Sequence, residues 1–267
     1  MKTIRALGCA GVLLNSALIA PSAKAADITE MGPSWTGPYI GVNIGYGWDE
    51  GDADIKFKPT GDQGLDDFLQ EMVDIGLYPT SFSPDGGGIS GGGQLGYNWQ
   101  LSSDWVVGIE ADLQASDIDN SESVTEERPF FQGQKTGVGK EVDWFGTLRA
   151  RAGYLINPQW LLYATGGIAY GETRLSYNTV NTFAGCIPGG TLCVDDASSG
   201  FKVGWTIGAG AEVMLAPNWS VKAEYLYVDL GGRSLDARSS TVEPIVANVS
   251  ADYREQIARL GLNYHFD

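Results

Sequence analysis

The chain is poor in the side chains on which most catalytic and metal sites depend. Its 267 residues include one histidine, His265, and three cysteines. His265 stands one residue before the terminal aromatic residue, and no obvious serine and aspartate complete a nucleophilic constellation. No Gly-Lys-Ser or Gly-Lys-Thr follows the glycine clusters "DGGGISGGGQLG" and "WTIGAGAE", so a phosphate loop is not indicated. We therefore expect no enzymatic activity and no cofactor. The glycines are expected to allow bends and close packing of strands.

The N-terminus carries an export signal. Lys2 and Arg5 precede an apolar stretch that ends near Ala20, and "AKA" supplies a small-x-small cleavage pattern. The alternative, a membrane anchor, needs about 20 apolar residues, and this stretch is shorter. We predict a signal peptide over 1–25, cleaved between Ala25 and Ala26 after export through the Sec pathway, and a short periplasmic segment over 26–37.

Basic residues are scarce in the predicted mature chain. Three of the 17 Lys and Arg residues and none of the 33 Asp and Glu residues lie in the signal, which leaves a net charge near −19. Such an excess of negative charge disfavours nucleic-acid binding. Acidic residues gather at 49–54, but their spacing matches no EF-hand, so we assign no metal ligands. A solvated acidic loop is the default interpretation, and a divalent contact that bridges to lipopolysaccharide phosphates is the alternative.

Two cysteines follow the signal, Cys186 and Cys193, in the sequence "CIPGGTLC". The Pro-Gly-Gly turn can bring them together, and an exported protein would oxidise the pair. Closing so short a loop is worth roughly 2 to 3 kcal/mol. The alternative is two free thiols.

No apolar run after the signal approaches the 18 or more residues of a spanning helix, and the hydrophobic period is two. In "YIGVNIGYGW" (39–48), Ile, Val, Ile, Tyr and Trp alternate with small or polar residues. The same alternation predicts seven more strands, at 88–100, 105–116, 141–156, 160–175, 201–215, 219–230 and 252–266. The connections alternate between short turns and long loops, so 38–267 is predicted to be an all-β, eight-stranded antiparallel up-and-down transmembrane β-barrel with short periplasmic turns and long extracellular loops.

Charged residues alternate with the apolar ones on these strands. If the apolar face meets lipid, the charges line the lumen of a closed barrel, because hydrocarbon tolerates no unpaired sheet edge. Counted from the short turns, charges of opposite sign lie at the same depth in the barrel: Glu110 is expected opposite Arg151, Asp112 opposite Arg149 and Glu212 opposite Lys222. Barrel shear can shift these partners. The predicted luminal charge network comprises Glu110, Asp112, Arg149, Arg151, Glu212, Lys222, Glu224 and Arg259. A soluble barrel with its apolar face inside is the alternative.

A tryptophan directly follows each of the three short turns: Trp105, Trp160 and Trp219. An indole can bury its ring in lipid while its N–H stays in water, so these residues are predicted to form a periplasmic aromatic girdle. In the first long loop, the apolar residues of "GLDDFLQEMVDIGL" follow helical spacing up to Gly76. We expect a helix at 65–76 that covers the barrel mouth or the other loops.

Several segments resemble a known family. "WTGPYIGVNIGYGW", "GGGQLGYNWQ", "GTLRARAGYL", "PNWSVKAEYLY" and "IARLGLNYHF" are similar to the small outer-membrane β-barrel proteins of alpha-class proteobacteria, which include abundant surface antigens often labelled porin-like. In that family the last strand serves as an assembly signal, and Leu260, Leu262, Tyr264 and Phe266 match it, whereas Asp267 is an addition.

The resemblance implies a non-enzymatic protein of the outer membrane that presents loops and supports the envelope. A narrow passive pore is one alternative, and binding of haem, a host factor or another ligand through the loops is a second. The expected partners are outer-membrane lipid and lipopolysaccharide, the barrel-assembly machinery during insertion, and an unidentified extracellular ligand, but no nucleic acid.

Overall fold

Eight long antiparallel strands close into a barrel. The structure is a computed structural model that describes residues 34–49, 51–83, 86–128 and 131–266. The predicted signal peptide, its cleavage position and residues 26–33 lie outside this range. The barrel strands are β1 (Gly37–Asp49), β4 (Gly87–Gln100), β5 (Trp105–Arg128), β6 (Phe131–Asn157), β7 (Trp160–Asn181), β8 (Val194–Ala216), β9 (Trp219–Arg238) and β10 (Val246–His265).

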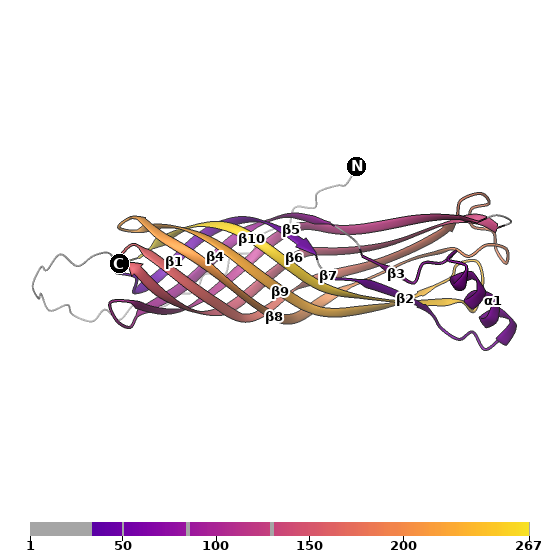
Figure 1. The fold of residues 1–267 in the computed structure, drawn as a ribbon, viewed down its shortest axis with the longest axis horizontal. Helices are drawn as coiled ribbons and strands as arrows, with labels where there is room; N and C mark the ends of the chain where they lie inside the picture. The colour runs from indigo at the N-terminus through magenta and orange to yellow at the C-terminus, as the bar shows by residue number, and fades with distance from the viewer. Residues whose placement is uncertain (1–33, 50, 84–85, 129–130, 267) are drawn as a thin grey trace, which may run out of the picture. The chain divides into compact units, whose positions relative to one another are not determined.

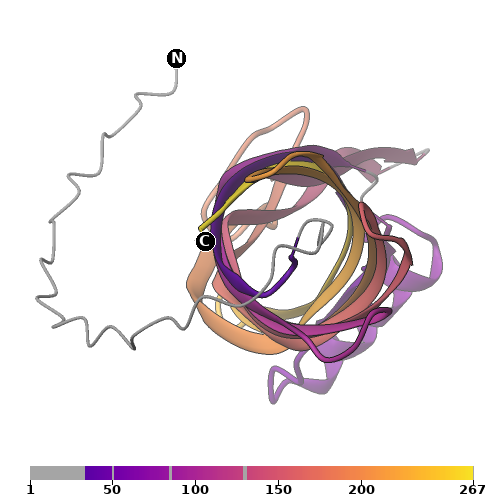
Figure 2. The same ribbon diagram turned by 90° about the vertical axis from the view of Figure 1, so that its left-hand side faces the viewer.

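Each barrel strand pairs with its neighbour in the chain, except that β1 pairs with both β4 and β10. The β1–β10 pairing runs from Tyr39 opposite His265 to Asp49 opposite Glu255, so the sheet has no open edge over this stretch (Figures 1 and 2). Closure satisfies the backbone groups that lipid cannot. The eight-stranded prediction is confirmed.

The strands run further than the hydrophobic alternation indicates. β5 to β10 are each 20 to 27 residues long, so most of the predicted loops at 117–140, 176–200 and 231–251 is strand. Beyond the lipid-facing part, buried positions are often polar, as at Thr136 and Thr179. The apolar period therefore fades although the strand continues.

The outer ends of these strands form a separate packed unit, which we call the head. Pairing between β8 and β9 stops at Trp205 opposite Asp229, and β4 pairs with β5 only as far as Asp119. The outer parts of β5, β6, β7 and β8 thus make one sheet. The outer parts of β9 and β10 make a second with β2 (Ala53–Phe57) and β3 (Ser81–Phe82).

Irregular pairings mark the level at which the barrel divides. β5 shifts register between Ala115 and Ile118, β6 between Val142 and Trp144, and the β9–β10 pair beside Tyr253. Bulges bend strands and increase their twist, which allows one closed sheet to open into two facing sheets.

The predicted helix is confirmed as α1 (Gln63–Asp74). The Asp62 carboxylate accepts hydrogen bonds from the backbone N–H groups of Gly64 and Leu65, and Gly76 follows the helix at φ 74°, which a glycine adopts without strain. Leu69 and Met72 are buried in the head. Among the described residues, no helix is long and apolar enough to cross a membrane.

Candidate functional site

The barrel has apolar side chains outside and charges inside. Val42 and Ile44 of β1 are each 62% exposed, whereas the luminal Glu212 and Lys222 are fully buried. A soluble protein shows the opposite arrangement, so the soluble-barrel alternative is wrong, and the apolar outer face suits lipid.

An ionic core fills the middle of the lumen. Its members come from five strands, and each is at most 5% exposed. Four acids face four bases: Glu110, Asp112, Glu212 and Glu224 with Arg149, Arg151, Lys222 and Arg259. The core is therefore neutral overall, which suits burial in a medium of low dielectric.

Each base in the core contacts at least one acid. Lys222 Nζ lies 2.8 Å from both carboxylate oxygens of Glu110. Arg149 contacts Glu110 and lies 3.0 Å from an oxygen of Asp112 and 3.0 Å from one of Glu224. Arg151 lies 2.6 Å from Glu212, and Arg259 lies 3.0 Å from Asp112 and donates from Nε to Glu224 at 2.7 Å.

The predicted register between β5 and β6 was wrong by two residues. Trp105 pairs with Tyr154, which places Arg149 opposite Glu110 and Arg151 opposite Gly108. The two strands are joined at the distant extracellular end, so no tight turn sets their register in the membrane. Glu212 does lie opposite Lys222, where the short 217–218 turn sets the register.

Two tyrosines that were not among the predicted luminal residues complete the core. Tyr39 Oη donates to Glu110 at 2.7 Å, and Tyr163 Oη donates to Glu224 at 3.0 Å. Gly96 lies opposite Tyr39 and Gly210 opposite Tyr163, where an added Cβ would lie 2.4 Å and 2.6 Å from the tyrosine rings. These glycines allow close packing of the aromatic rings, as expected. The position of each tyrosine on the polar face of its strand could have indicated that its side chain lies in the lumen.

His265 lies beside a serine and an acid after all. Ser220 Oγ is 2.5 Å from Glu212 Oε1 and 2.9 Å from His265 Nε2. The same nitrogen, His265 Nε2, is also 3.6 Å from Glu212 Oε1, whereas a hydrolytic triad places the serine and the acid on opposite nitrogens of the histidine ring. All three side chains are buried in the lumen. Among the described residues, no group of three or more His, Cys, Asp or Glu could hold a metal.

An apolar layer lies between the ionic core and the periplasm. Trp35, from the segment before β1, is fully buried among luminal side chains that include Val106, Leu161 and Met214. Its indole N–H donates to the carbonyl of Pro158 at 3.0 Å. Figure 2 shows the start of the described chain inside the ring of strands. We predicted a periplasmic segment over 26–37, but Trp35 within it lies inside the lumen.

A second apolar layer lies on the extracellular side of the ionic core. It consists of Val142, Phe145, Ala169, Leu226, Val228, Leu230, Tyr253 and Ile257. The lumen is therefore occupied by apolar, ionic and apolar layers in succession.

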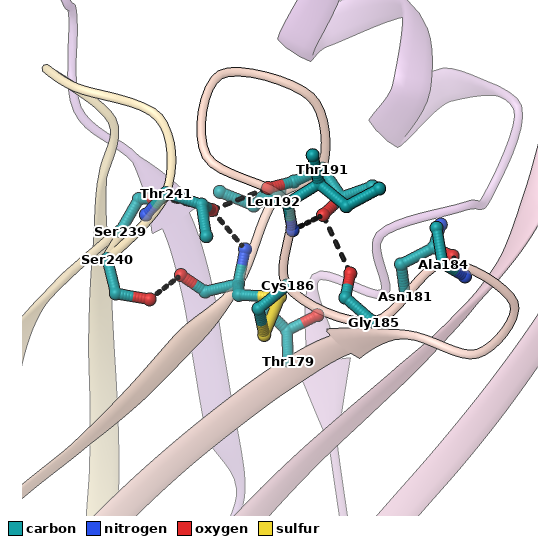
Figure 3. Close-up of a disulfide and its surroundings, with 12 residues drawn as sticks. Thr179, Asn181, Ala184, Gly185, Cys186, Thr191, Leu192, Ser239, Ser240 and Thr241 are labelled. Carbon is teal, nitrogen blue, oxygen red and sulfur yellow. Dashed lines mark hydrogen bonds between the residues drawn. A yellow bond between two sulfur atoms is a disulfide. The ribbon is translucent and has the colours of Figure 1, made fainter.

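The head has its own hydrophobic core, to which both sheets and α1 contribute, for example Val138, Val249 and Met72. The predicted disulfide between Cys186 and Cys193 is present. Thr241 Oγ1 accepts from the Cys193 backbone N–H at 3.0 Å, and Ser240 donates to the Cys193 carbonyl (Figure 3). The disulfide loop is thereby joined to the turn between β9 and β10.

Aromatic residues gather at both ends of the lipid-facing surface. Trp105, Trp160 and Trp219 are half exposed at the periplasmic end, and Trp219 packs on Tyr264 with ring centroids 5.1 Å apart. At the other end Trp205 packs on Tyr227. Trp219 to Tyr227 spans nine residues of β9, within the roughly 9 to 11 that a tilted strand needs to cross a bilayer.

Comparison with known proteins agrees with this architecture. The 31 kDa outer-membrane immunogenic protein of Brucella melitensis is 37% identical over 264 residues, which are 94% of this chain and 96% of that protein. The 22 kDa outer membrane protein of Rhizobium leguminosarum is 32% identical over 66% of each chain. The crystal structure of Ail from Yersinia pestis matches 86% of this chain and 99% of its own at 16% identity, with a TM-score of 0.36, a likeness too distant to support a conclusion.

The family model for the outer membrane protein beta-barrel domain matches residues 10–266. Together with the 37% identity, this shows that the chain belongs to the outer membrane protein beta-barrel family and resides in the outer membrane.

Proposed function

We propose that this protein is a non-enzymatic, non-conducting anchor that holds the head at the cell surface and helps to maintain the envelope. The observation that carries this proposal is the filled lumen. An eight-stranded barrel has room for side chains but little water, and here Trp35, the ionic core and the outer apolar layer occupy it in turn. An ion would have to displace buried apolar side chains at two levels.

The arrangement around His265 supports a role without catalysis. A nucleophilic serine needs the histidine as its base and an acid behind that histidine, whereas Ser220 is hydrogen-bonded directly to Glu212. The site is also closed toward the periplasm, because the Trp35 ring meets His265 edge-on with centroids 5.8 Å apart.

The outer face suits stable membrane insertion. Trp105, Trp160 and Trp219 provide the periplasmic girdle, where an indole ring contacts lipid and its N–H contacts water. Leu260, Leu262 and Phe266 point outward and are 59%, 40% and 47% exposed. With Tyr264 they present the alternating pattern that we propose the assembly machinery recognises. Outer-membrane lipid and lipopolysaccharide are the partners that surround this band.

Single-channel recording tests the proposal. The protein, purified from outer membranes and verified as folded by its heat-dependent shift in gel mobility, is added to a planar bilayer. We expect no discrete openings. Stable, stepwise conductance from folded protein would refute the sealed lumen and favour a narrow pore.

A matched pair of variants shows whether the assay can detect an open lumen. Trp35→Ala removes the largest side chain of the periplasmic layer, and Trp160→Ala removes a lipid-facing tryptophan of equal size. If the filled lumen is the barrier, leak increases in the first variant more than in the second.

A further inference from the structure

A polar cluster lies beyond the outer apolar layer, where the barrel meets the head. Asp49 of β1 stands directly opposite Glu255 of β10, and Lys140 of β6 reaches across the lumen to Asp49. Lys140 Nζ bonds Asp49 Oδ2 and donates to the Gly51 carbonyl at 2.8 Å. Asp49, Lys140 and Glu255 are 9%, 1% and 2% exposed, so the cluster is shielded from bulk water.

The oxygens of this cluster are not all satisfied. Among the described residues, neither carboxylate oxygen of Glu255 has a hydrogen-bond partner, and the side-chain oxygen of Asn120 also lacks one. Asn120 lies opposite Lys140 in the β5–β6 pairing and is 1% exposed. Buried polar atoms in native proteins are usually paired with protein, water or an ion. The two unpaired carboxylate oxygens of Glu255 therefore indicate an absent positive or donor group.

In the part of the chain that the structure describes, the nearby donors are bound elsewhere. The Tyr253 hydroxyl donates to the Arg174 carbonyl, and the Tyr253 ring faces Lys140 Nζ at 5.5 Å. Arg233 of β9 donates hydrogen bonds to the hydroxyls of Thr173 and Ser198 and to the Gly200 carbonyl. Lys140 is bound to Asp49 and Gly51.

The cluster also lacks one positive charge. Two carboxylates face a single ammonium group, and an unpaired buried charge is costly in apolar surroundings. One monovalent cation restores neutrality, whereas a divalent cation would reverse the imbalance. Carboxylate, amide and carbonyl oxygens are hard ligands that suit alkali and alkaline-earth ions.

We propose that the cluster binds one monovalent alkali cation such as Na⁺ at the Glu255 carboxylate, beside the Asp49–Lys140 pair. The cation couples the outer end of the barrel to the head, because Glu255 lies on β10, which continues from one into the other. This site is independent of whether the lumen conducts.

Unfolding in NaCl and in choline chloride of equal ionic strength tests the site, since choline is too large for a buried oxygen cage. At a Na⁺ concentration ten times the dissociation constant, the unfolding equilibrium constant should fall about tenfold relative to choline. Glu255→Gln should abolish the difference. Asp252→Asn, an outward-facing acid on the same strand, should retain it.

A direct readout is the line width of the ²³Na resonance in the presence of the folded wild-type protein. Broadening that exceeds that of Glu255→Gln supports the site. Equal unfolding in NaCl and choline chloride would overturn the proposal. If stability instead rises on acidification from pH 8 to pH 6 without any dependence on Na⁺, and Glu255→Gln removes this rise, the position holds a proton and the cation proposal is wrong.

Discussion

Removing one charge from the ionic core gives the strongest prediction. Lys222 is fully buried, and its ammonium group lies 2.8 Å from both oxygens of Glu110. Lys222→Met keeps an unbranched apolar stem of similar reach but leaves the core with four acids and three bases. Breaking a buried pair by removing one partner costs about 3 to 5 kcal/mol, which is roughly a hundredfold to several thousandfold in the unfolding equilibrium constant.

A second substitution separates charge imbalance from lost packing. Lys222→Met combined with Glu110→Gln restores neutrality, while the glutamine can still meet Tyr39 and Arg149. We expect the double variant to recover more than half of the stability lost by the single variant. Replacing a buried ion pair by neutral groups is often close to neutral in stability.

The assay is urea unfolding of the purified protein in detergent, followed by tryptophan fluorescence and by the heat-dependent gel shift. Lys58→Met is the matched control, because Lys58 and Asp236 form an exposed pair at 2.6 Å with side chains 48% and 45% exposed. Such a pair is worth about 0 to 1 kcal/mol. If Lys222→Met costs no more than Lys58→Met, water screens the lumen and the filled-lumen argument fails.

Three further predictions concern the periplasmic apolar layer and the head. Trp35→Ala should destabilise the barrel by about 3 to 5 kcal/mol, measured by urea unfolding, and a loss below 1 kcal/mol would contradict its burial in the lumen. Replacing Cys186 and Cys193 by serine should lower the free energy of unfolding of the disulfide loop by roughly 2 to 3 kcal/mol and speed its proteolysis on intact cells, while membrane insertion, the control, stays unchanged. Equal digestion of the variant and the wild type would show that Thr241 holds the loop without the disulfide. Hydrogen bonds from the Thr60 backbone N–H and hydroxyl lower the pKa of Asp66, so they stabilise the start of α1 above the usual carboxylate pKa, and this contribution is lost as the pH falls through the lowered pKa. Thr60→Val removes the hydroxyl but keeps the backbone N–H, so it should reduce, without abolishing, the acid sensitivity of amide exchange in α1, and an unchanged profile would exclude the hydroxyl as a contributor.

The sequence alone determined the alternation of faces, the strand number, the short turns and the balance of luminal charges. Each follows from local rules: period two along a strand, proline and asparagine in turns, and the incompatibility of charge with lipid. The helix before Gly76 and the Cys186–Cys193 pair are equally local, because each depends on spacing within one segment.

Only the tertiary structure decided how these elements combine. The β5–β6 register was wrong because the segments are joined at the distant extracellular end, where no tight turn constrains the pairing. The head was missed because its buried positions include Thr136 and Thr179, whose polarity hides the strand period. The insertion of Trp35, the contact of Ser220 with His265 and the unpaired Glu255 depend on which strands face each other across a closed barrel, and that is set by closure and shear.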